Sequence, residues 1–494
     1  MVADPPPVLD TGPPRAAAGP DLLGLLRAMA EAGRHDDPGH SRHLLRAFLQ
    51  LAASAGRIGS AGAAQTVRYW VSQLDRLLSA QLNEVMHHPT FQALEGTWRG
   101  LLYLVGRGRP GDGLKVKVLN VTKLELVRDL ERAVEFDTSV LFRKVYEEEY
   151  GQLGGEPYGL LVGDYRFGRG PVDVALLRQI SQVAAAAHAP FVAAADPKMF
   201  NADRFAELAG QRDLGRVFAG EEYAHWQGLR NTEDARYVAL ALPRVLGRLP
   251  HGEYPPRVTE FLFTEAVGGP DPDKYLWVSA AWAYAAVAAE AFVRDGWFMR
   301  TRGVEGGGRV DGLPAAAFPT DDGDVAVKSP TEVALPERRE FELADLGFLP
   351  LLHARNRGYV AFMGGQSVHR PRAYADPAAT ANAELSAKFN YLLSVSRFAH
   401  YLKVLARDKL GSGMEAGPCE GWLNDWLQQY VIGNPATVSD EVKARKPLTE
   451  AEVRLQPVAG QPGRYQAVVF IRPHYQVETL TTAMRLVAEV PRRS

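Results

Sequence analysis

A chain of 494 residues exceeds what one hydrophobic core ordinarily organises, so we expect two or three domains. Its 56 lysines and arginines nearly balance its 58 aspartates and glutamates, which argues against a nucleic acid as the main partner, because that partner favours a basic surface. Apolar residues make up 46% and charged residues 23%, as in soluble globular proteins.

Three features predict a cytoplasmic protein. The single cysteine, Cys419, cannot form an internal disulfide, which favours a reducing compartment. The amino terminus, MVADPPPVLDTGPPR, has neither the basic start nor the apolar centre of a signal peptide. The most apolar run, from Tyr275 to Val293, contains Ser279 and Glu290, which a bilayer would penalise. We therefore expect a buried helix there rather than a membrane span.

The first 62 residues alternate between loose and helical stretches. Residues 1–20 are rich in proline and have little to bury, so we expect a disordered tail. Residues 21–62 are interpreted as short helices and a linker, beginning with a helix over residues 21–30. That helix is either a packed element or an exposed docking peptide. Its apolar residues are Leu22, Leu23, Leu25, Leu26 and Met29.

Residues 63–113 are predicted to form a helical hairpin. An apolar stripe at helical spacing ends near Val85, and Pro89 then suits the first turn of a new helix, where its missing N–H is not needed. In this second helix we expect an aromatic seam to form the hairpin core, with Glu95 and Arg99 paired on the other face. The predicted core residues are Phe91, Leu94, Trp98 and Leu101, with Leu102 and Val105 on the same face.

Residues 114–380 alternate strand-like and helical patterns, which predicts an α/β region with a mixed sheet flanked by helices. The first predicted strand is KVKVLNV, at residues 115–121, and a typical helical stretch is Val172–Ala187. Residues 303–329 are rich in glycine, proline and aspartate, which indicates a loop. Further strand-like runs lie at residues 158–162, 190–194, 237–242 and 359–362.

Residues 381–494 are expected to combine long helices with an antiparallel strand meander. One helix is predicted from about Ala381 to Asp408, and another from Pro418 to Val431. The last strand runs almost to the end of the chain, and it is either an ordinary edge strand or one that adds to another chain's sheet. The candidate strand-exchange residues are Tyr475, Val477, Leu480, Leu486 and Val490.

No motif predicts catalysis, a cofactor or a metal site. The stretch GRGRPG at residues 106–111 has the spacing of a dinucleotide-binding loop, but it follows a helix and precedes a strand, the reverse of what that motif needs. His87 and His88 point in different directions on a helix and lack partners at ligand spacing. Cys419 lies beside Glu420, which raises rather than lowers the pKa of a thiol. We therefore expect a protein that is not an enzyme.

Several longer blocks of sequence carry a family likeness. The first is LNEVMHHPTFQALEGTWRGLLYLV, at residues 82–105. Others are EYAHW at residues 222–226, FMGGQ at 362–366, NAELSA at 382–387 and SRFAHYLK at 396–403. In this order they closely resemble the large contractile-sheath subunit of the type VI secretion system, the TssC/VipB family. The resemblance covers roughly residues 65–490 and implies the contractile-sheath fold.

The resemblance implies a structural role in the bacterial cytoplasm, without an active site. Its members pair with a small sheath subunit, TssB/VipA, and further copies stack as a helical lattice around a tube of Hcp rings, on a membrane-anchored baseplate. Contraction of this sheath drives effector delivery. The resemblance implies neither a nucleic-acid partner nor direct insertion of the protein into a membrane. The resemblance also implies that the terminal strand is exchanged with neighbouring subunits.

The resemblance further implies a use for the predicted helix at residues 21–30. In similar sheaths a short amino-terminal helix is offered to the AAA+ ATPase ClpV, which disassembles contracted sheath. The docking face in this chain would be formed by Leu22, Leu23, Leu26 and Met29.

Two alternatives remain open. One is a sheath protein of another contractile injection system, such as a phage tail. The other is an α/β enzyme without a recognisable motif, whose site is a carboxylate–guanidinium cluster. Mixed charges of this kind are more often a solvated face or a subunit contact. The cluster would consist of Arg230, Glu233, Asp234 and Arg236.

Overall fold

The computed structural model describes most of residues 63–474, part of residues 39–50, and the backbone of residues 484–489. The predicted tail and the helix at residues 21–30 therefore lie outside the described residues. Two compact units make up the chain: Met1–His87 with His251–Ala266, and His88–Pro250 with Val267–Ser494. Between 63 and 474 the gaps are residues 110, 112, 153, 253–260, 262, 268–273, 316, 320–321, 355–358, 412–414 and 459–464.

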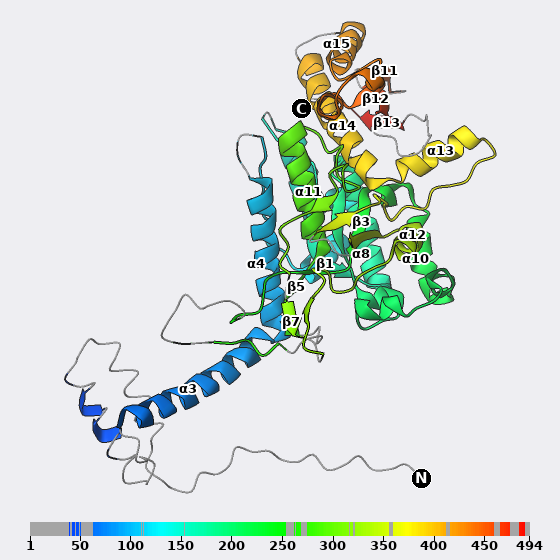
Figure 1. Ribbon diagram of the computed structural model, residues 1–494. Helices are drawn as coiled ribbons and strands as arrows, with labels where there is room; N and C mark the ends of the chain where they lie inside the picture. Colours follow the sequence, from blue (N-terminus) through cyan, green and yellow to red (C-terminus); the bar gives the residue numbers. More distant parts are fainter. Residues whose placement is uncertain are drawn as a thin grey trace. The chain divides into compact units, whose positions relative to one another are not determined.

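The first unit is built around helix α3 (Ala63–Met86), drawn in blue in Figure 1. The carboxy-terminal end of α3 and the residue that follows it contact the end of the segment at residues 251–266, which belongs to the same unit. The Asn83 side-chain oxygen accepts a hydrogen bond from the Ala266 N–H at 2.8 Å, and His87 Nε2 lies 3.3 Å from Glu265 Oε1. Much of the apolar stripe of α3 is exposed, with Val71, Leu77, Leu78, Leu82 and Val85 on the surface.

A six-stranded mixed sheet is the centre of the second unit, with the strand order β1-β2-β3-β9-β10-β6. Strands β1, β2, β3 and β9 run parallel, and β10 pairs antiparallel with both β9 and β6. This arrangement confirms the predicted α/β class. The strands are β1 (Leu161–Phe167), β2 (Phe191–Ala195), β3 (Val238–Leu242), β9 (Leu349–His353), β10 (Val360–Phe362) and β6 (Arg309–Val310).

The sheet forms because its central strands are apolar on both faces. Every residue of β2 and β3 is buried, as expected for parallel strands covered by helices on two sides. Along β2, Phe191 and Ala193 belong to the core cluster that contains helix α8 (Pro171–Ala187). The residue between them, Val192, belongs to the cluster of helix α11 (Ala280–Asp295). The strand's two-residue period therefore separates two cores, one on each face.

Helix α11 confirms the predicted buried helix: most of its residues are buried. Helix α4 (Pro89–Gly108) lies alongside α11 (Figure 1). The buried residues of α4 are Gly96, Gly100, Leu104 and Gly108, so the helices approach through glycines.

The predicted core residues of α4 are therefore not the ones that α4 packs against α11, and a core shared with α3 stays a prediction. Of the predicted residues, Leu94 is 57% and Trp98 64% exposed, and Phe91 and Leu101 are only partly buried. A close helix contact needs small side chains, and a Cβ on Gly100 would lie 2.3 Å from the Trp282 ring of α11. The predicted helices α3 and α4 both exist, while their packing as a hairpin stays a prediction.

Three other predicted elements differ from the structure. The loop expected at residues 303–329 contains three short strands, β6, β7 and β8, at Arg309–Val310, Ala317–Pro319 and Val325–Val327. The expected strand at residues 115–121 runs without a turn or bend, but it has no partner strand among the described residues. The helix expected from Ala381 to Asp408 is two helices, α13 (Pro377–Ser386) and α14 (Phe389–Gly411). Between them the Phe389 N–H donates to the Gly365 carbonyl oxygen, outside the helix, at 2.5 Å.

The second unit also contains two short strand pairs and several further helices. Two antiparallel pairs are formed by β4 (Val245–Leu246) with β5 (Trp277–Val278), and by β7 (Ala317–Pro319) with β8 (Val325–Val327). The other α-helices are α5 (Lys123–Arg132), α6 (Val140–Phe142), α7 (Glu148–Tyr150), α9 (Leu214–Phe218), α10 (Ala224–Arg230), α12 (Glu337–Asp345), α15 (Ala416–Gln428) and α16 (Asp440–Arg445).

The predicted carboxy-terminal meander is confirmed as a separate three-stranded antiparallel sheet, β11-β12-β13. It lies beside helices α14 and α15, drawn in yellow and orange in Figure 1. Its strands are β11 (Leu448–Pro457), β12 (Tyr465–Pro473) and β13 (Met484–Glu489).

Candidate assembly surfaces

Helix α15 covers one edge of the carboxy-terminal sheet with polar side chains. Asn424 donates to the Val453 carbonyl oxygen and accepts from the Val453 N–H, both at 2.8 Å. One turn later Gln428 donates to the Ala451 carbonyl oxygen at 3.0 Å, and one turn earlier Glu420 accepts from the Leu455 N–H at 2.6 Å. These bonds occupy main-chain groups of β11 that another strand would need.

This sealed edge depends on matching repeats. Four residues of α-helix advance about 6 Å, and two residues of strand advance about 6.8 Å. Polar residues spaced by four on α15 therefore meet every second residue of β11. The spacing of four is visible in the sequence, but the partner of these residues is not, because only the fold places α15 beside β11.

The other edge of this sheet is β13, which pairs only with β12 among the described strands. Of the predicted strand-exchange residues, Leu486 lies in β13, opposite Val469 of β12. The others, Tyr475, Val477, Leu480 and Val490, lie outside the described residues, and strand exchange stays a prediction. The ATPase-docking residues Leu22, Leu23, Leu26 and Met29 also lie outside them.

Helix α4 presents a second distinctive surface. The face turned away from α11 carries Leu94, Trp98, Leu102 and Val105, which are 57%, 64%, 67% and 37% exposed. The ion pair predicted on the other side is confirmed, with Arg99 Nε 2.7 Å from Glu95 Oε1. Arg248 reaches the same carboxylate at 2.7 Å. Burial alone would raise the pKa of Glu95, but hydrogen bonds from Arg248 and Arg99 outweigh burial and lower it.

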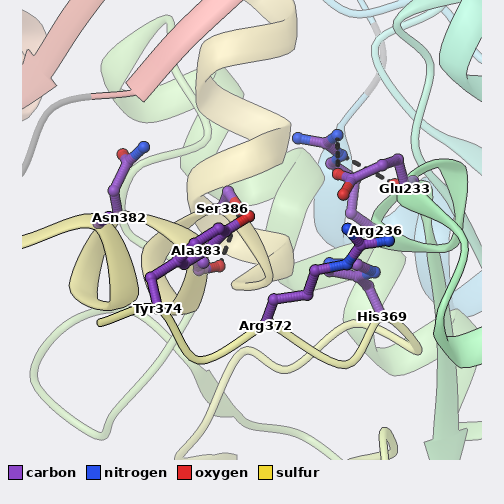
Figure 2. A pocket seen from close by; sticks show the side chains of 9 residues that line it. Glu233, Arg236, His369, Arg372, Tyr374, Asn382, Ala383 and Ser386 are labelled. Atoms are coloured by element: carbon purple, nitrogen blue, oxygen red, sulfur yellow. Dashed lines mark hydrogen bonds and ion pairs between the residues drawn. The ribbon is translucent and has the colours of Figure 1, made fainter. Parts of the chain in front are cut away.

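A small polar pocket of about 240 Å³ lies between helix α13 and the loop that follows β10. Figure 2 shows Arg236, Arg372 and His369 on one side and Ser386 of α13 opposite. The Ser386 hydroxyl donates to the Ala383 carbonyl oxygen at 2.8 Å. The pocket is lined by Glu233, Arg236, His369, Arg372, Tyr374, Ala379, Asn382, Ala383 and Ser386.

Histidine 369 is held in one tautomer at this pocket. His369 Nδ1 lies 2.8 Å from the Thr232 carbonyl oxygen, which can only accept, so Nδ1 carries the proton. Burial lowers the pKa of His369 and keeps the ring neutral near pH 7. The ring therefore serves to position the loop through a main-chain contact.

The predicted carboxylate–guanidinium cluster does not form one site. Arg230 is buried and donates to the main-chain oxygens of Asp345, at 2.7 Å, and Val368, at 3.1 Å. Burial lowers the pKa of Arg230 to about 10, so it remains charged at neutral pH. Arg236 instead pairs with Glu233 at 2.6 Å beside the pocket, and burial raises the pKa of Asp234.

Two further histidines belong to the core. His188 Nδ1 lies 3.1 Å from the Tyr237 hydroxyl, and His400 Nε2 donates to the Ala187 carbonyl oxygen at 3.2 Å. Burial lowers the pKa of His188 to about 3. In the part of the chain that the structure describes, no group of histidine, cysteine and carboxylate residues could hold a metal ion. None of the helices described there is both long and apolar enough to cross a bilayer.

Comparison with known proteins gives a consistent result. The model of the EvpB/VC_A0108 tail sheath N-terminal domain matches residues 68–369, and that of the EvpB/VC_A0108 tail sheath gpW/gp25-like domain matches residues 378–490. The type VI secretion system sheath protein TssC1 of Pseudomonas aeruginosa is 47% identical over 449 residues, which is 90% of each chain.

Among solved structures, a chain of the cryo-EM structure of the anti-feeding prophage baseplate, 6-fold symmetrised, overlaps with a TM-score of 0.35. Its identity is 12%, over 74% of this chain and 81% of that one, and so weak an overlap carries no argument. The family models and the curated relative together span nearly the whole described chain. This chain belongs to the EvpB/VC_A0108 tail sheath family.

Proposed function

We propose that this chain is the large structural subunit of a type VI secretion contractile sheath and acts by assembly rather than by catalysis. The observation that carries the proposal is the family match along both the α/β region and the carboxy-terminal region. The 47% identity to a type VI sheath protein favours this system over other contractile machines. The division of Arg230 from its predicted partners supports a role without an active site.

The proposed assembly contains two kinds of subunit. The chain pairs with the small sheath subunit, TssB/VipA, and further copies continue the contact as a helical lattice around the Hcp tube. Contacts that repeat without closing a ring produce such a helix. The lattice stands on a membrane-anchored baseplate in the bacterial cytoplasm, and its contraction drives effector delivery.

Contraction requires links that survive a change of packing between rigid bodies. Strand addition provides such links, since main-chain hydrogen bonds hold a strand whatever its side chains are. The carboxy-terminal sheet supports this mechanism, because α15 seals its β11 edge while β13 is the other edge. We therefore keep residues 475–490 as the proposed exchanged strand.

The test is electron microscopy of this chain coexpressed with the small sheath subunit. Hollow helical tubules are expected from the full chain, and none after deletion of residues 475–494. Deletion of residues 491–494 alone leaves β13 in place and is the matched control. Copurification of the two subunits from each variant shows whether the shortened chain still folds.

Each result has a clear meaning. Tubules that persist without residues 475–494 would contradict strand exchange but leave the sheath role intact. Two soluble chains that never associate would contradict the sheath role itself. A ligand-dependent rise in melting temperature of a dispersed monomer would then favour the enzyme alternative.

We further propose that residues 21–30 dock on the ATPase ClpV through Leu22, Leu23, Leu26 and Met29. A peptide of residues 18–34 should bind the amino-terminal domain of the ATPase through this apolar face. The same peptide with serine at the four positions is the control. Absence of binding at high micromolar concentration would remove the proposal.

A further inference from the structure

Residues 115–121 have the composition of a strand and no strand beside them. The sequence KVKVLNV is rich in β-branched and apolar residues, which favour strands. Its backbone has no helix, turn or bend, and the main-chain groups of Lys115 to Asn120 form no hydrogen bond with any described residue. Six consecutive residues thus offer their N–H and C=O groups to another partner.

This segment is fixed in position by its side chains. Lys117 Nζ lies 2.5 Å from Glu149 Oε1 and above the Tyr158 ring, and Lys115 pairs with Glu156. Val116 packs against the core cluster of α11. These contacts hold the chain extended before any partner arrives, which lowers the entropic cost of pairing.

The far end of the segment is fixed beside the six-stranded sheet. The Tyr165 hydroxyl of β1 donates to the Val121 carbonyl oxygen at 2.6 Å, and Lys123 donates to the Arg166 carbonyl oxygen at 2.6 Å. Thr122 then begins helix α5 with a capping box, its side chain and that of Glu125 bonding reciprocally. Strand β1 is the terminal strand of that sheet, so the segment lies at a place where the sheet can be extended.

Between its fixed ends the segment exposes apolar side chains. Val118 is 69% and Leu119 50% exposed, and they point to opposite sides of an extended chain. An extended partner would cover one of them while satisfying the main-chain groups. A globular or helical partner would cover the side chains and leave those groups unpaired, at a cost of about 1–3 kcal/mol for each buried group.

We propose that residues 115–121 are a strand-addition site that receives an extended segment of a second polypeptide, the small sheath subunit. This inference rests on the proposed function. The described edge strands of a second copy, such as β13, are held within folded sheets, whereas this site fits a segment that is extended by itself, and the proposed function supplies such a second polypeptide. The site is separate from the carboxy-terminal sheet, and it pairs two different chains rather than successive copies of one.

Amide hydrogen exchange provides the direct test. In the purified chain alone, the amides of residues 115–120 are expected to exchange quickly. In complex with the small subunit, exchange at alternate positions should slow by at least about tenfold, equivalent to 1.4 kcal/mol of local stability. Exchange that stays fast in the complex would overturn the proposal. Protection that appears only when heterodimers stack, and not in the heterodimer, would overturn the assignment of the partner.

A proline pair tests the main-chain requirement separately. Successive N–H groups of an extended chain point to opposite sides, so only one of Val118 and Leu119 donates to an added strand. Val118→Pro and Leu119→Pro each remove an N–H that has no described partner, so neither should lower the melting temperature of the chain alone. One of them should lose copurification with the small subunit, and the other should keep it.

The controls separate this proposal from the proposed function. Val118→Ala and Leu119→Ala keep both N–H groups and should still bind. If neither proline variant, or both alike, lost binding while the unmodified chain bound normally, strand addition would be contradicted. If the unmodified chain itself failed to bind the small subunit, the sheath role would fail instead.

Discussion

The glycine contact between α4 and α11 yields the sharpest prediction. A Cβ added at Gly100 would lie 2.3 Å from Trp282 Cδ1 and 2.6 Å from two more atoms of that ring. Carbon atoms are normally separated by about 3.5–4.0 Å, so the ring or the helix would have to move by more than about 1 Å. Trp282 cannot turn away easily, since it is only 9% exposed and its Nε1–H donates to Asp164 at 3.0 Å.

The expected magnitude follows from two opposing effects. Overpacking of this kind costs about 1–3 kcal/mol, and loss of the indole hydrogen bond adds about 1 kcal/mol. Replacement of a helical glycine by alanine returns about 1 kcal/mol through helix propensity. Gly100→Ala should therefore destabilise the α4–α11 contact by about 1–3 kcal/mol.

The same helix contains its own control. Gly106 is exposed, and an added Cβ there meets nothing within 4 Å, so Gly106→Ala should stabilise by up to about 1 kcal/mol. Because a chain with several units need not unfold in one step, the measurement is local amide exchange across α4, with the apparent melting temperature beside it. Equal stability of the two alanine variants would refute the argument that glycine permits this contact.

Three further predictions concern burial, the sealed edge and pH. Trp282→Ala should lower the free energy of unfolding by about 3–5 kcal/mol, whereas Trp98→Ala, at an exposed position, should change it by less than about 0.5 kcal/mol. Chemical denaturation of each variant, monitored by amide hydrogen exchange in α4 and α11, compares the two. Asn424→Ala should cost about 1–3 kcal/mol by leaving both main-chain groups of Val453 unpaired, and faster exchange of the Val453 amide would show it; an unchanged amide would contradict the sealing role. Glu95 has a pKa below 4.5 in the folded chain, so its stabilising effect is complete above the unfolded value near 4.5 and is lost as the pH falls through the lower folded value. Glu95→Gln should therefore weaken the chain at neutral pH and flatten its acid melting profile, and an identical pH profile would argue against the arginine contacts.

Hydrophobic pattern predicted the elements that are buried on all sides. Strands β2 and β3 and the alanine-rich helix α11 have no competing polar face, so their sequences and burial agree. It did not predict which face of α4 packs against α11, where the largest apolar residues, including Trp98, are not the buried ones. Size predicts burial only where the neighbour leaves room, and a helix pressed against α11 buries glycine instead.

Local propensity was also informative but incomplete at the other sites. It predicted a strand at residues 115–121, where the structure has no paired strand, because propensity cannot say whether a neighbouring strand belongs to the same chain. The charged cluster around Arg230 was separated because burial directs that guanidinium to main-chain oxygens, a choice that depends on tertiary packing. The polar residues of α15 that cap β11 carried a usable spacing, but their partner lies about 30 residues later in the chain.

Because α15 caps β11, the two edges of the carboxy-terminal sheet differ: one is occupied and the other, β13, is open among the described residues. A sheet with two open edges could add one copy at each edge and so grow without a limit. With Asn424 and its neighbours occupying one edge, growth through this sheet can proceed only from the β13 side. Each carboxy-terminal sheet can therefore add one further strand and no more, so a lattice that contains it must grow through a second, different contact. That limit arises from three side chains on one helix.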